Sequence, residues 1–531
     1  MSETCLEKYQ SSCKTQWWLL AALLLVYAGA AGGIARVEYP IDDEAYYASP
    51  AFNLAQKGFF GMTVVESSGA TFKGLSQANY WQQPLHSLLL SGWARVFGAA
   101  LWSQRSLSVV FGALDLIAWF LIVRTLTGRD SPALVTVALL AVSPMLLGVA
   151  GSGRPDMMAL ALGHSALAAY LVLRERSLAR ALLWGFSLVV LSGLTHPLGG
   201  ILGLANLSLV VVYLDHSVLR WKHAAFIAAP FLIGGLAWGA YIARHPDWFI
   251  TQFMGDAGIT DGYGVSRLSG FRNPLAALYR FGHNLAVYEI SDFSRCRPGE
   301  PACGAAGDFT LRSLAKLYVL ALYVFSFTAA LSIKALRRAG GVMLLTLLIA
   351  TDYSVVALME ARPGIIKYFP HLLVMMPAVI ALLREYWRRT LFTVACLLLA
   401  AVQSSRLAHS IWLNPYAEYA SSASVLQQQP YRGMDMWAKA EYAYAAGFDH
   451  VVEDLCYGLY SQRRPPFIVI ATDNFEGTLN SSDYNKRLLT REYSVRYNDP
   501  RIVILGRTTA AGASPGPSEP AGGECRLWRQ P

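Results

Sequence analysis

The chain has 531 residues, of which 54% are hydrophobic, and its mean hydropathy is +0.36. A membrane-spanning helix needs about 20 predominantly apolar residues, and runs of this kind recur between Trp17 and His409. Ordinary soluble domains do not carry so many long uncharged runs. The composition therefore excludes a soluble protein and predicts an all-α polytopic membrane protein.

The formal net charge of +9 does not indicate nucleic-acid binding, because the basic residues form no single patch. They lie in short turns between the apolar runs, as the positive-inside rule expects of cytoplasmic turns. Membrane lipids are thus expected partners, and nucleic acid is not.

The seven cysteines are scattered rather than arranged as metal knuckles. Cys296 and Cys303 share one polar loop, and Cys456 and Cys525 share the C-terminal region. Each pair would form a disulfide if its region faces an oxidising compartment. Free thiols are the alternative.

The first apolar run, Trp17 to Ala35, follows a polar N-terminus. A cleaved signal peptide is the competing interpretation, since Ala28-Gly29-Ala30 is a stretch of small residues. The alternation of the later runs favours an uncleaved first span with a cytoplasmic N-terminus. The acidic cluster Asp42-Asp43-Glu44 then lies outside.

Two segments of the first outer loop, residues 37–98, are too polar or too short to cross the membrane. Asp43 to Lys57 has apolar residues at helical spacing, an acidic start and Gly58 as a stop. Pro50 is expected to kink this helix or to delay its first turn. Pro84 to Phe97 gathers its large apolar residues on one face, which predicts an amphipathic helix lying in the membrane interface.

With both helices in the interface, the other apolar runs alternate across the membrane and every basic turn lies on one side. We therefore expect about eleven spans, with the N-terminus inside and the C-terminus outside. The runs after the first are Ser106 to Thr125, Pro132 to Gly151, Met157 to Leu173, Leu182 to Thr195, Ile201 to Leu214, Ala225 to Ala243, Leu314 to Ile333, Val342 to Met359, His371 to Leu383 and Leu391 to Ser404.

The hydropathy falls from Trp412, which predicts a membrane catalytic domain of residues 1–411 and a small α/β extracytoplasmic domain of residues 412–531. Within the second domain, a helix is predicted over Trp437 to Gly447. Buried strands are predicted over Phe467 to Ile470 and Ile502 to Leu505. Ala510 to Gly523 is rich in Pro, Gly, Ser and Ala, which is typical of a disordered tail.

Separate outer connections send acids, bases and cations to the same membrane face. They supply Asp42, Asp43, Glu44, Lys73, Gln83 and His86, then Arg154 and Asp156, then His196, and last Glu360, Arg362, Lys367 and Tyr368. A site of this composition suits a substrate with a lipid tail in the bilayer and a charged head at its surface.

Transfer of a sugar from a phosphate-linked lipid needs a carboxylate that takes or polarises the acceptor proton as C1 develops positive charge. Asp43 or Asp156 fits that requirement. The reaction also needs cations to hold the leaving phosphate, and Arg154, Arg362 and Lys367 fit this role.

A divalent cation is a further possibility, because three consecutive acidic residues could coordinate one through oxygen. His86 or His196 could join such a site. The spacing fixes no metal, so the sequence leaves the cofactor unknown.

The same residues have structural alternatives. Asp42 and Asp43 could cap a helix N-terminus. Arg154 and Asp156 could be a local ion pair at a span boundary. His196, before Pro197, could be a hydrogen-bonded turn histidine.

The segment Asp43-Glu44-Ala45-Tyr46-Tyr47 resembles the Asp-Glu motif of GT-C glycosyltransferases. The resemblance points to the bacterial branch related to protein O-mannosyltransferases and to the aminoarabinose transferase of lipid A. Tyr80 to Gly98 resembles the second juxtamembrane helix of that branch, and Arg154-Pro155-Asp156 resembles its second acidic motif. Gly193 to Pro197 and Lys367 to Pro370 resemble two later motifs.

This resemblance covers roughly the first four hundred residues, although each motif is short. It implies an inverting enzyme that takes sugar from a polyprenyl-phosphate-linked donor and gives it to a lipid, glycan or protein acceptor. The active site would face the periplasm from a bacterial inner membrane. The implied catalytic residues are Asp43 and Asp156, and the implied substrate-binding residues are Glu44, Tyr47, His86, Arg154, His196, Arg362 and Lys367.

The chain departs from this family at Gln83, where many relatives have a basic residue before the proline. Lys73 is a candidate replacement for that cation.

Two other functions compete. A transporter or flippase would use Asp115 and Asp352, which lie within spans, as a relay, but no internal repeat is visible. An oligosaccharide ligase would use a diphosphate-linked donor.

Overall fold

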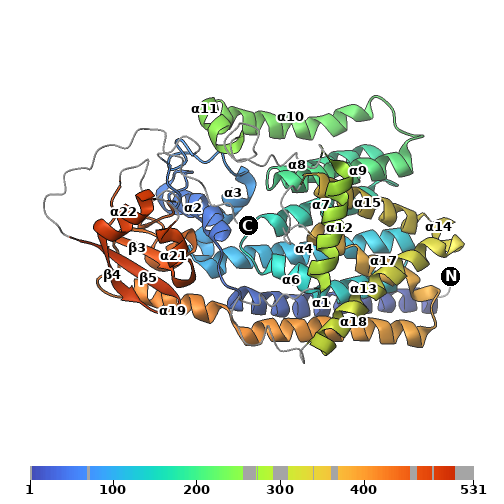
Figure 1. Ribbon diagram of the computed structural model, residues 1–531. Helices are drawn as coiled ribbons and strands as arrows, with labels where there is room; N and C mark the ends of the chain where they lie inside the picture. The colour runs from blue at the N-terminus through green and yellow to red at the C-terminus, as the bar shows by residue number, and fades with distance from the viewer. Residues whose placement is uncertain are drawn as a thin grey trace.

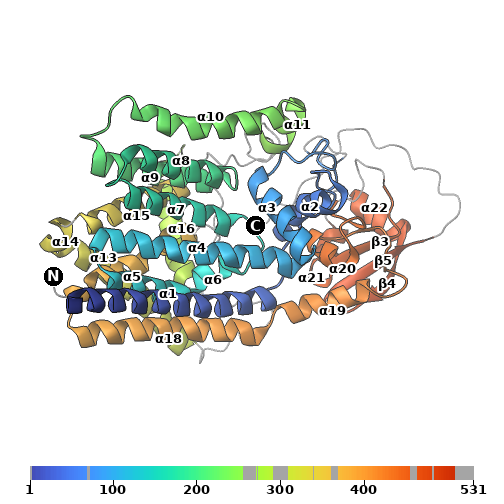
Figure 2. The same ribbon diagram turned by 180° about the vertical axis from the view of Figure 1, so that it is seen from behind.

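The computed structural model describes residues 3–67, 72–254, 271, 273–290, 309–338, 340–359, 369–454, 463–480 and 483–508. Figures 1 and 2 show long helices lying side by side in a bundle, with a small sheet at one end. We call this the sheet-bearing end of the bundle. The N-terminus lies at the opposite end (Figure 1).

Most of the bundle consists of apolar helices joined by short turns. Their bounds are α1 (Glu3–Val37), α4 (Leu101–Thr127), α5 (Asp130–Ala141), α6 (Pro144–Ala150), α7 (Asp156–Leu173), α8 (Leu178–Gly193), α9 (Pro197–Asp215), α10 (His223–Ile242), α11 (Pro246–Phe249), α12 (Pro274–Ile290), α13 (Phe309–Ser332), α14 (Lys334–Arg338), α15 (Gly341–Met359), α16 (Phe369–Leu373), α17 (Met376–Leu382) and α18 (Arg389–Leu413).

Within the described part of the chain, seven helices are long and apolar enough to cross a membrane, or eight if α5 and α6 form one span. The axes of α5 and α6 are bent by 65°. The break falls before Pro144, which has no N–H to continue the helix. The predicted multi-pass helical architecture is confirmed, whereas the number of eleven spans and their orientation remain predictions.

Three predicted spans coincide with shorter helices. Leu182 to Thr195 corresponds to α8, which has 16 residues. The apolar part of α13 covers Leu317–Ser332. The predicted span His371 to Leu383 is divided between α16 and α17.

The two predicted interfacial helices form at the sheet-bearing end, as α2 (Asp42–Lys57) and α3 (Pro84–Phe97). The face of α3 that packs on the protein combines the polar His86 and Ser91 with Leu90. Leu88, Val96 and Phe97, on its apolar face, are exposed. A helix with polar residues buried and large apolar residues exposed fits the membrane interface.

Pro50 does not delay the first turn of α2, which was one of the two effects expected of it. Pro50 lies inside the helix, yet the helix begins at Asp42 and continues to Lys57. The first turn is not delayed, because the backbone N–H of Ile41 is bonded by the side chain of Glu44 (3.1 Å). Gly58 ends the helix with φ 78°, as the stop signal predicts.

After α18 the chain forms α19 (Tyr416–Leu426) and then a five-stranded mixed sheet of order β2-β1-β3-β5-β4. Strand β1 pairs in parallel with β2 and β3, and β5 pairs antiparallel with β3 and β4. The bounds are β1 (Met436–Trp437), β2 (Val451–Val452), β3 (Phe467–Ala471), β4 (Tyr493–Asn498) and β5 (Ile502–Arg507), with helices α20 (Ala443–Ala446), α21 (Thr472–Leu479) and α22 (Asp483–Arg491).

Both predicted strands are present, as β3 and β5. The predicted helix from Trp437 to Gly447 was wrong in its first part: Trp437 belongs to β1, and only Ala440–Tyr442, as a 3-10 turn, and α20 are helical. Trp437 is 2% exposed because it packs in the core of the sheet. The predicted tail, residues 510–523, lies outside the described residues.

Helix α19 and the sheet with its helices, which we call the sheet domain, share one hydrophobic core with the first loop. Ala45 and Met62 from the loop pack in the same cluster as Tyr419, Met436 and Ile502. Backbone bonds reinforce this contact, since the N–H of Glu453 donates to the carbonyl of Val64 (2.8 Å). The sheet domain is therefore held directly over α2.

Candidate active site

Glu44 is the centre of a buried polar network at the start of α2. Besides the N–H of Ile41, it accepts hydrogen bonds from Arg105 and from the backbone N–H of Gly153 (2.6 Å). Its side chain is 1% exposed. Glu44 therefore bonds the backbone N–H just before α2, and Oδ1 of Asp42 accepts from the first-turn N–H of Asp43 (2.7 Å).

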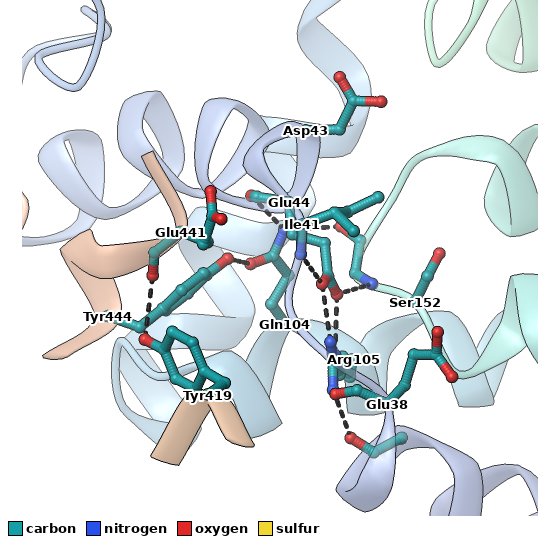
Figure 3. Close-up of polar contacts among 12 residues, drawn as sticks. Glu38, Ile41, Asp43, Glu44, Gln104, Arg105, Ser152, Tyr419, Glu441 and Tyr444 are labelled. Atoms are coloured by element: carbon teal, nitrogen blue, oxygen red, sulfur yellow. Dashed lines mark hydrogen bonds and ion pairs between the residues drawn. The ribbon is translucent and has the colours of Figure 1, made fainter. Parts of the chain in front are cut away.

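Arg105, on α4, is fully buried and makes a two-pronged ion pair with Glu44. Its Nε and Nη2 atoms lie 2.8 and 2.7 Å from the two carboxylate oxygens. Its Nη1 donates to the carbonyls of Ala35 (2.8 Å) and Glu38 (2.9 Å), at the end of α1 (Figure 3). This pair joins α1, α2 and α4, and Glu44 is fully occupied by protein partners.

Asp43 points away from that network, as Figure 3 shows. Its carboxylate forms an ion pair with Arg154, whose Nε also bonds Oδ2 of Asp156 at 2.7 Å. Asp43 is 35% exposed, whereas Asp156 is 3% exposed. The structure thus brings together the two acidic residues that the sequence singled out, with one guanidinium between them.

The turn that carries Arg154 is fixed by α4. The side-chain amide of Gln104 donates to the carbonyl of Gly153 (2.6 Å), and the hydroxyl of Ser108 donates to the carbonyl of Arg154 (3.3 Å). Gln104 and Ser108 are one helical turn apart and so lie on the same face. This face of α4 sets the position of Asp156 at the start of α7.

His86 lies under Tyr47, with ring centroids 5.7 Å apart and the rings edge to face. It is 1% exposed, and neither ring nitrogen has a hydrogen-bond partner within the described residues. Burial lowers the pKa of His86 to about 4, although the charge of Asp156 acts in the opposite direction. The imidazole is therefore neutral at physiological pH, with one donor and one acceptor.

His196 is at the N-terminal boundary of α9 and is 9% exposed. The turn before it contacts α3 through a backbone bond from the N–H of Leu85 to the carbonyl of Leu194 (2.9 Å). His196 and His86 therefore belong to neighbouring segments of the same end of the bundle.

Some predicted site residues are not placed by the structure. Arg362 and Lys367 lie outside the described residues, and so do the cysteine pairs 296/303 and 456/525. Lys73 is exposed on the first loop.

No group of three or more His, Cys, Asp or Glu side chains that could hold a metal ion occurs among the residues that the structure describes. The three consecutive acids do not converge, because Glu44 points to Arg105 and Asp43 to Arg154.

The two acids within the bundle have partners on neighbouring helices. Oδ1 of Asp115, on α4, lies 2.6 Å from Nδ1 of His164, on α7. Oδ1 of Asp352, on α15, accepts from the amide of Asn206, on α9 (2.7 Å). These contacts tie helix pairs together in the bundle interior.

Sequence reasoning missed Gln104 and Arg105. A signal was present, since both are polar residues at the start of a long apolar span, where such residues are costly without partners. It also missed Glu441 and Glu453, which the sheet domain brings to α2.

Glu453 accepts a hydrogen bond from the hydroxyl of Tyr46 (2.7 Å). Burial raises the pKa of Glu453 to about 6 and that of Glu441 to about 8. The charge of Asp42 contributes to both shifts and that of Glu453 to the shift of Glu441, whereas the hydrogen bond from Tyr46 acts to lower the pKa of Glu453. Two partly protonated acids therefore lie between α2 and the sheet domain.

No protein-family model and no curated protein matches this sequence. Among solved structures, the fold is similar to that of ArnT from Cupriavidus metallidurans bound to undecaprenyl phosphate. The TM-score is 0.54 at 14% identity, covering 93% of this chain and 98% of that one.

The fold is also similar to that of the Archaeoglobus fulgidus oligosaccharyltransferase in its apo form. The TM-score is again 0.54, at 12% identity, over 93% of this chain and 75% of that one. A second structure of that enzyme, tethered to an acceptor peptide containing the NVT sequon, matches with a TM-score of 0.53. This chain therefore has the fold of the GT-C membrane glycosyltransferases, the superfamily that its motifs resemble.

Proposed function

We propose that the protein is an inverting GT-C-type glycosyltransferase. It moves a sugar from a polyprenyl-phosphate-linked donor to an acceptor on the periplasmic face of a bacterial inner membrane. The observation that carries the proposal is the arrangement in which Arg154 bridges Asp43 and Asp156. The fold it shares with ArnT, whose structure holds undecaprenyl phosphate, supports it.

In the proposed reaction, Asp43 is the base, because it is the more exposed of the two carboxylates. It takes the proton of the acceptor hydroxyl while that oxygen attacks C1 of the sugar. The bond from C1 to the phosphate oxygen breaks, and its electron pair leaves with the lipid phosphate. Attack from the face opposite the phosphate inverts the configuration at C1.

Arg154 is the cation that meets the leaving phosphate, where negative charge grows as the bond breaks. Asp156, buried beside it, fixes the orientation of the guanidinium. Arg362 and Lys367 are proposed as additional phosphate contacts.

Sugar recognition is proposed for Tyr47, His86 and His196, with Glu44 as the support of the first motif. The neutral imidazole of His86 suits a sugar hydroxyl better than a phosphate, because it carries no charge.

The test compares Asp43→Asn and Asp156→Asn with Asp42→Asn as the matched control, since Asp42 is an exposed acid beside Asp43. Purified full-length variants are assayed with a polyprenyl-monophosphate sugar. Each of the first two should lose about 10²-fold or more in kcat, whereas the control keeps its activity. Normal transfer by both Asp43→Asn and Asp156→Asn would refute the proposal.

The second candidate is an oligosaccharide ligase, because the fold matches the archaeal oligosaccharyltransferase with the same TM-score of 0.54 as ArnT. It predicts a preference for diphosphate-linked over monophosphate-linked donors. Parallel assays with the two donors, at equal lipid concentration, decide between them.

A further inference from the structure

Tyr444 of the sheet domain bonds directly to the buried polar network of the candidate active site. The hydroxyl of Tyr444, on α20, donates a hydrogen bond to Oε1 of Gln104 (Figure 3). Gln104 is fully buried on α4, at the edge of the Glu44 network. A residue of the last third of the chain thus bonds directly to a group that supports both acidic motifs.

Every hydrogen-bonding atom of the Gln104 side-chain amide has a partner. Its Nε2 donates to the carbonyl of Glu44 (2.8 Å) and to that of Gly153 (2.6 Å). Because an amide has only these two N–H bonds, its oxygen must face the third neighbour, which is Tyr444. Burial and the charge of Glu44 raise the pKa of Tyr444, so its hydroxyl keeps its proton and acts as the donor.

Both carbonyls belong to the segments that carry the catalytic acids. Glu44 follows Asp43, and Gly153 precedes Arg154. The approach at Gly153 is so close that an added Cβ would lie 2.6 Å from Cγ of Gln104. One buried amide therefore bonds both acidic segments, next to the direct bond from the N–H of Gly153 to Glu44.

We propose that Tyr444 and Gln104 are positioning residues for the transfer reaction, so that the sheet domain forms part of the active-site scaffold. Tyr444 orients the amide of Gln104, and the amide holds Asp43 and Asp156 at their working separation. This inference rests on the proposed function. A misplacement of about 1 Å at a reacting group lowers a rate by about 10²-fold. Loss of one positioning hydrogen bond can therefore lower the rate of transfer.

Removal of the Tyr444 hydroxyl should not detach the domain. Other contacts hold it, including the bond from Tyr46 to Glu453 (2.7 Å) and the bond from Thr63 Oγ1 to the carbonyl of Phe448 (2.9 Å). The matched control is Tyr419, which lies in the same domain, is 2% exposed and donates to the carbonyl of Glu441 (3.0 Å). Tyr419→Phe also removes a buried tyrosine hydroxyl, but one that does not bond Gln104.

The experiment is a double-mutant cycle on the full chain, with Tyr444→Phe, Gln104→Ala and the double variant. Tyr444→Phe is expected to lower kcat by about 10-fold or more, with the acceptor KM within about 2-fold. In the Gln104→Ala background the same change should have no further effect, because Tyr444 acts through Gln104. Tyr419→Phe should stay within about 2-fold of the unchanged protein. Additive losses would overturn the inference.

A second measurement does not depend on activity. Hydrogen exchange is followed at the backbone amides of residues 42–46 and 151–156. Tyr444→Phe should accelerate exchange in both segments, whereas Tyr419→Phe should accelerate it in neither segment. Gly153→Ala, which displaces Gln104 from the other side without touching the sheet domain, should reproduce the pattern. Unchanged exchange in both segments would overturn the positioning role, whereas activity in Asp43→Asn and Asp156→Asn would overturn only the transferase proposal.

Discussion

The guanidinium of Arg154 binds the carboxylates of Asp43 and Asp156, which belong to separate segments of the chain. Only a planar fork can hold two carboxylates in fixed directions, whereas the lysine ammonium is a point charge. Arg154→Lys should therefore lower kcat by about 10²-fold, measured as sugar transfer from a monophosphate donor.

Arg174→Lys is the control for Arg154→Lys. Arg174 makes a two-pronged pair with a single carboxylate, at 2.8 Å to each oxygen of Asp215, and it follows the opposite end of α7. Equal losses in the two variants would show that the effect comes from the bundle and not from the site.

The Glu44–Arg105 pair predicts a loss of stability. Both side chains are buried, and removal of one partner leaves an uncompensated charge, which costs about 3–5 kcal/mol. Arg105→Met should therefore lower the thermal unfolding midpoint strongly, and Glu44→Gln together with Arg105→Met should restore part of it.

Lys57→Ala is the comparison for that pair, since Lys57 pairs with Asp449 at the surface and both are more than a third exposed. Exposed pairs contribute about 0–1 kcal/mol. A similar drop for Lys57→Ala and Arg105→Met would contradict the central role of Glu44.

His86 predicts a pH dependence of stability. Its pKa is lowered from 6.5 to about 4 by burial, so between these values the unfolded chain binds a proton that the folded chain does not. The free energy of unfolding should therefore fall as the pH falls from 6.5 to 4. His86→Gln should flatten this slope, whereas His216→Gln, at an exposed histidine, should leave it unchanged.

Glu441 predicts the opposite slope at higher pH. Burial first, and then the charges of Asp42 and Glu453, raise its pKa from 4.5 to about 8, although Lys439 acts against this. The folded chain holds a proton here that the unfolded chain loses, so stability is full below pH 4.5 and decreases as the pH rises through 8.

Glu441→Gln should remove this loss, because the amide stays neutral. Thermal unfolding of the full chain at pH 5, 7 and 9 measures this loss of stability. Asp435→Asn is the control, because Asp435 is an exposed acid. A variant that loses stability with pH as steeply as the unchanged protein would contradict the assignment.

Asp115 and Asp352 separate the transferase from the transporter. Because each bonds a neighbouring helix, Asp115→Asn and Asp352→Asn should lower the unfolding midpoint while sugar transfer at low temperature is retained. The transporter would be favoured if Asp115→Asn and Asp352→Asn abolished activity while Asp43→Asn and Asp156→Asn retained it.

Local patterns determined much of the architecture. The bounds of α3 follow from Pro84 at its start and from the amphipathic spacing of its residues, both of which act within a few neighbours. The stop at Gly58 and the strands β3 and β5 follow equally from local signals. The short strand at Trp437 was missed, because two residues carry no period and only pairing with β2 and β3 makes them a strand.

By itself the sequence determined which residue types gather at this end of the bundle: the acids of residues 42–44 and 154–156, and the histidines His86 and His196. Only the tertiary structure decided which of them act on one another. It turned Glu44 inward to Arg105, left Asp43 exposed with Arg154, and brought Tyr444 to Gln104. The physical reason is that a buried polar group needs partners, and those partners come from segments far apart in the chain, where no local pattern records them.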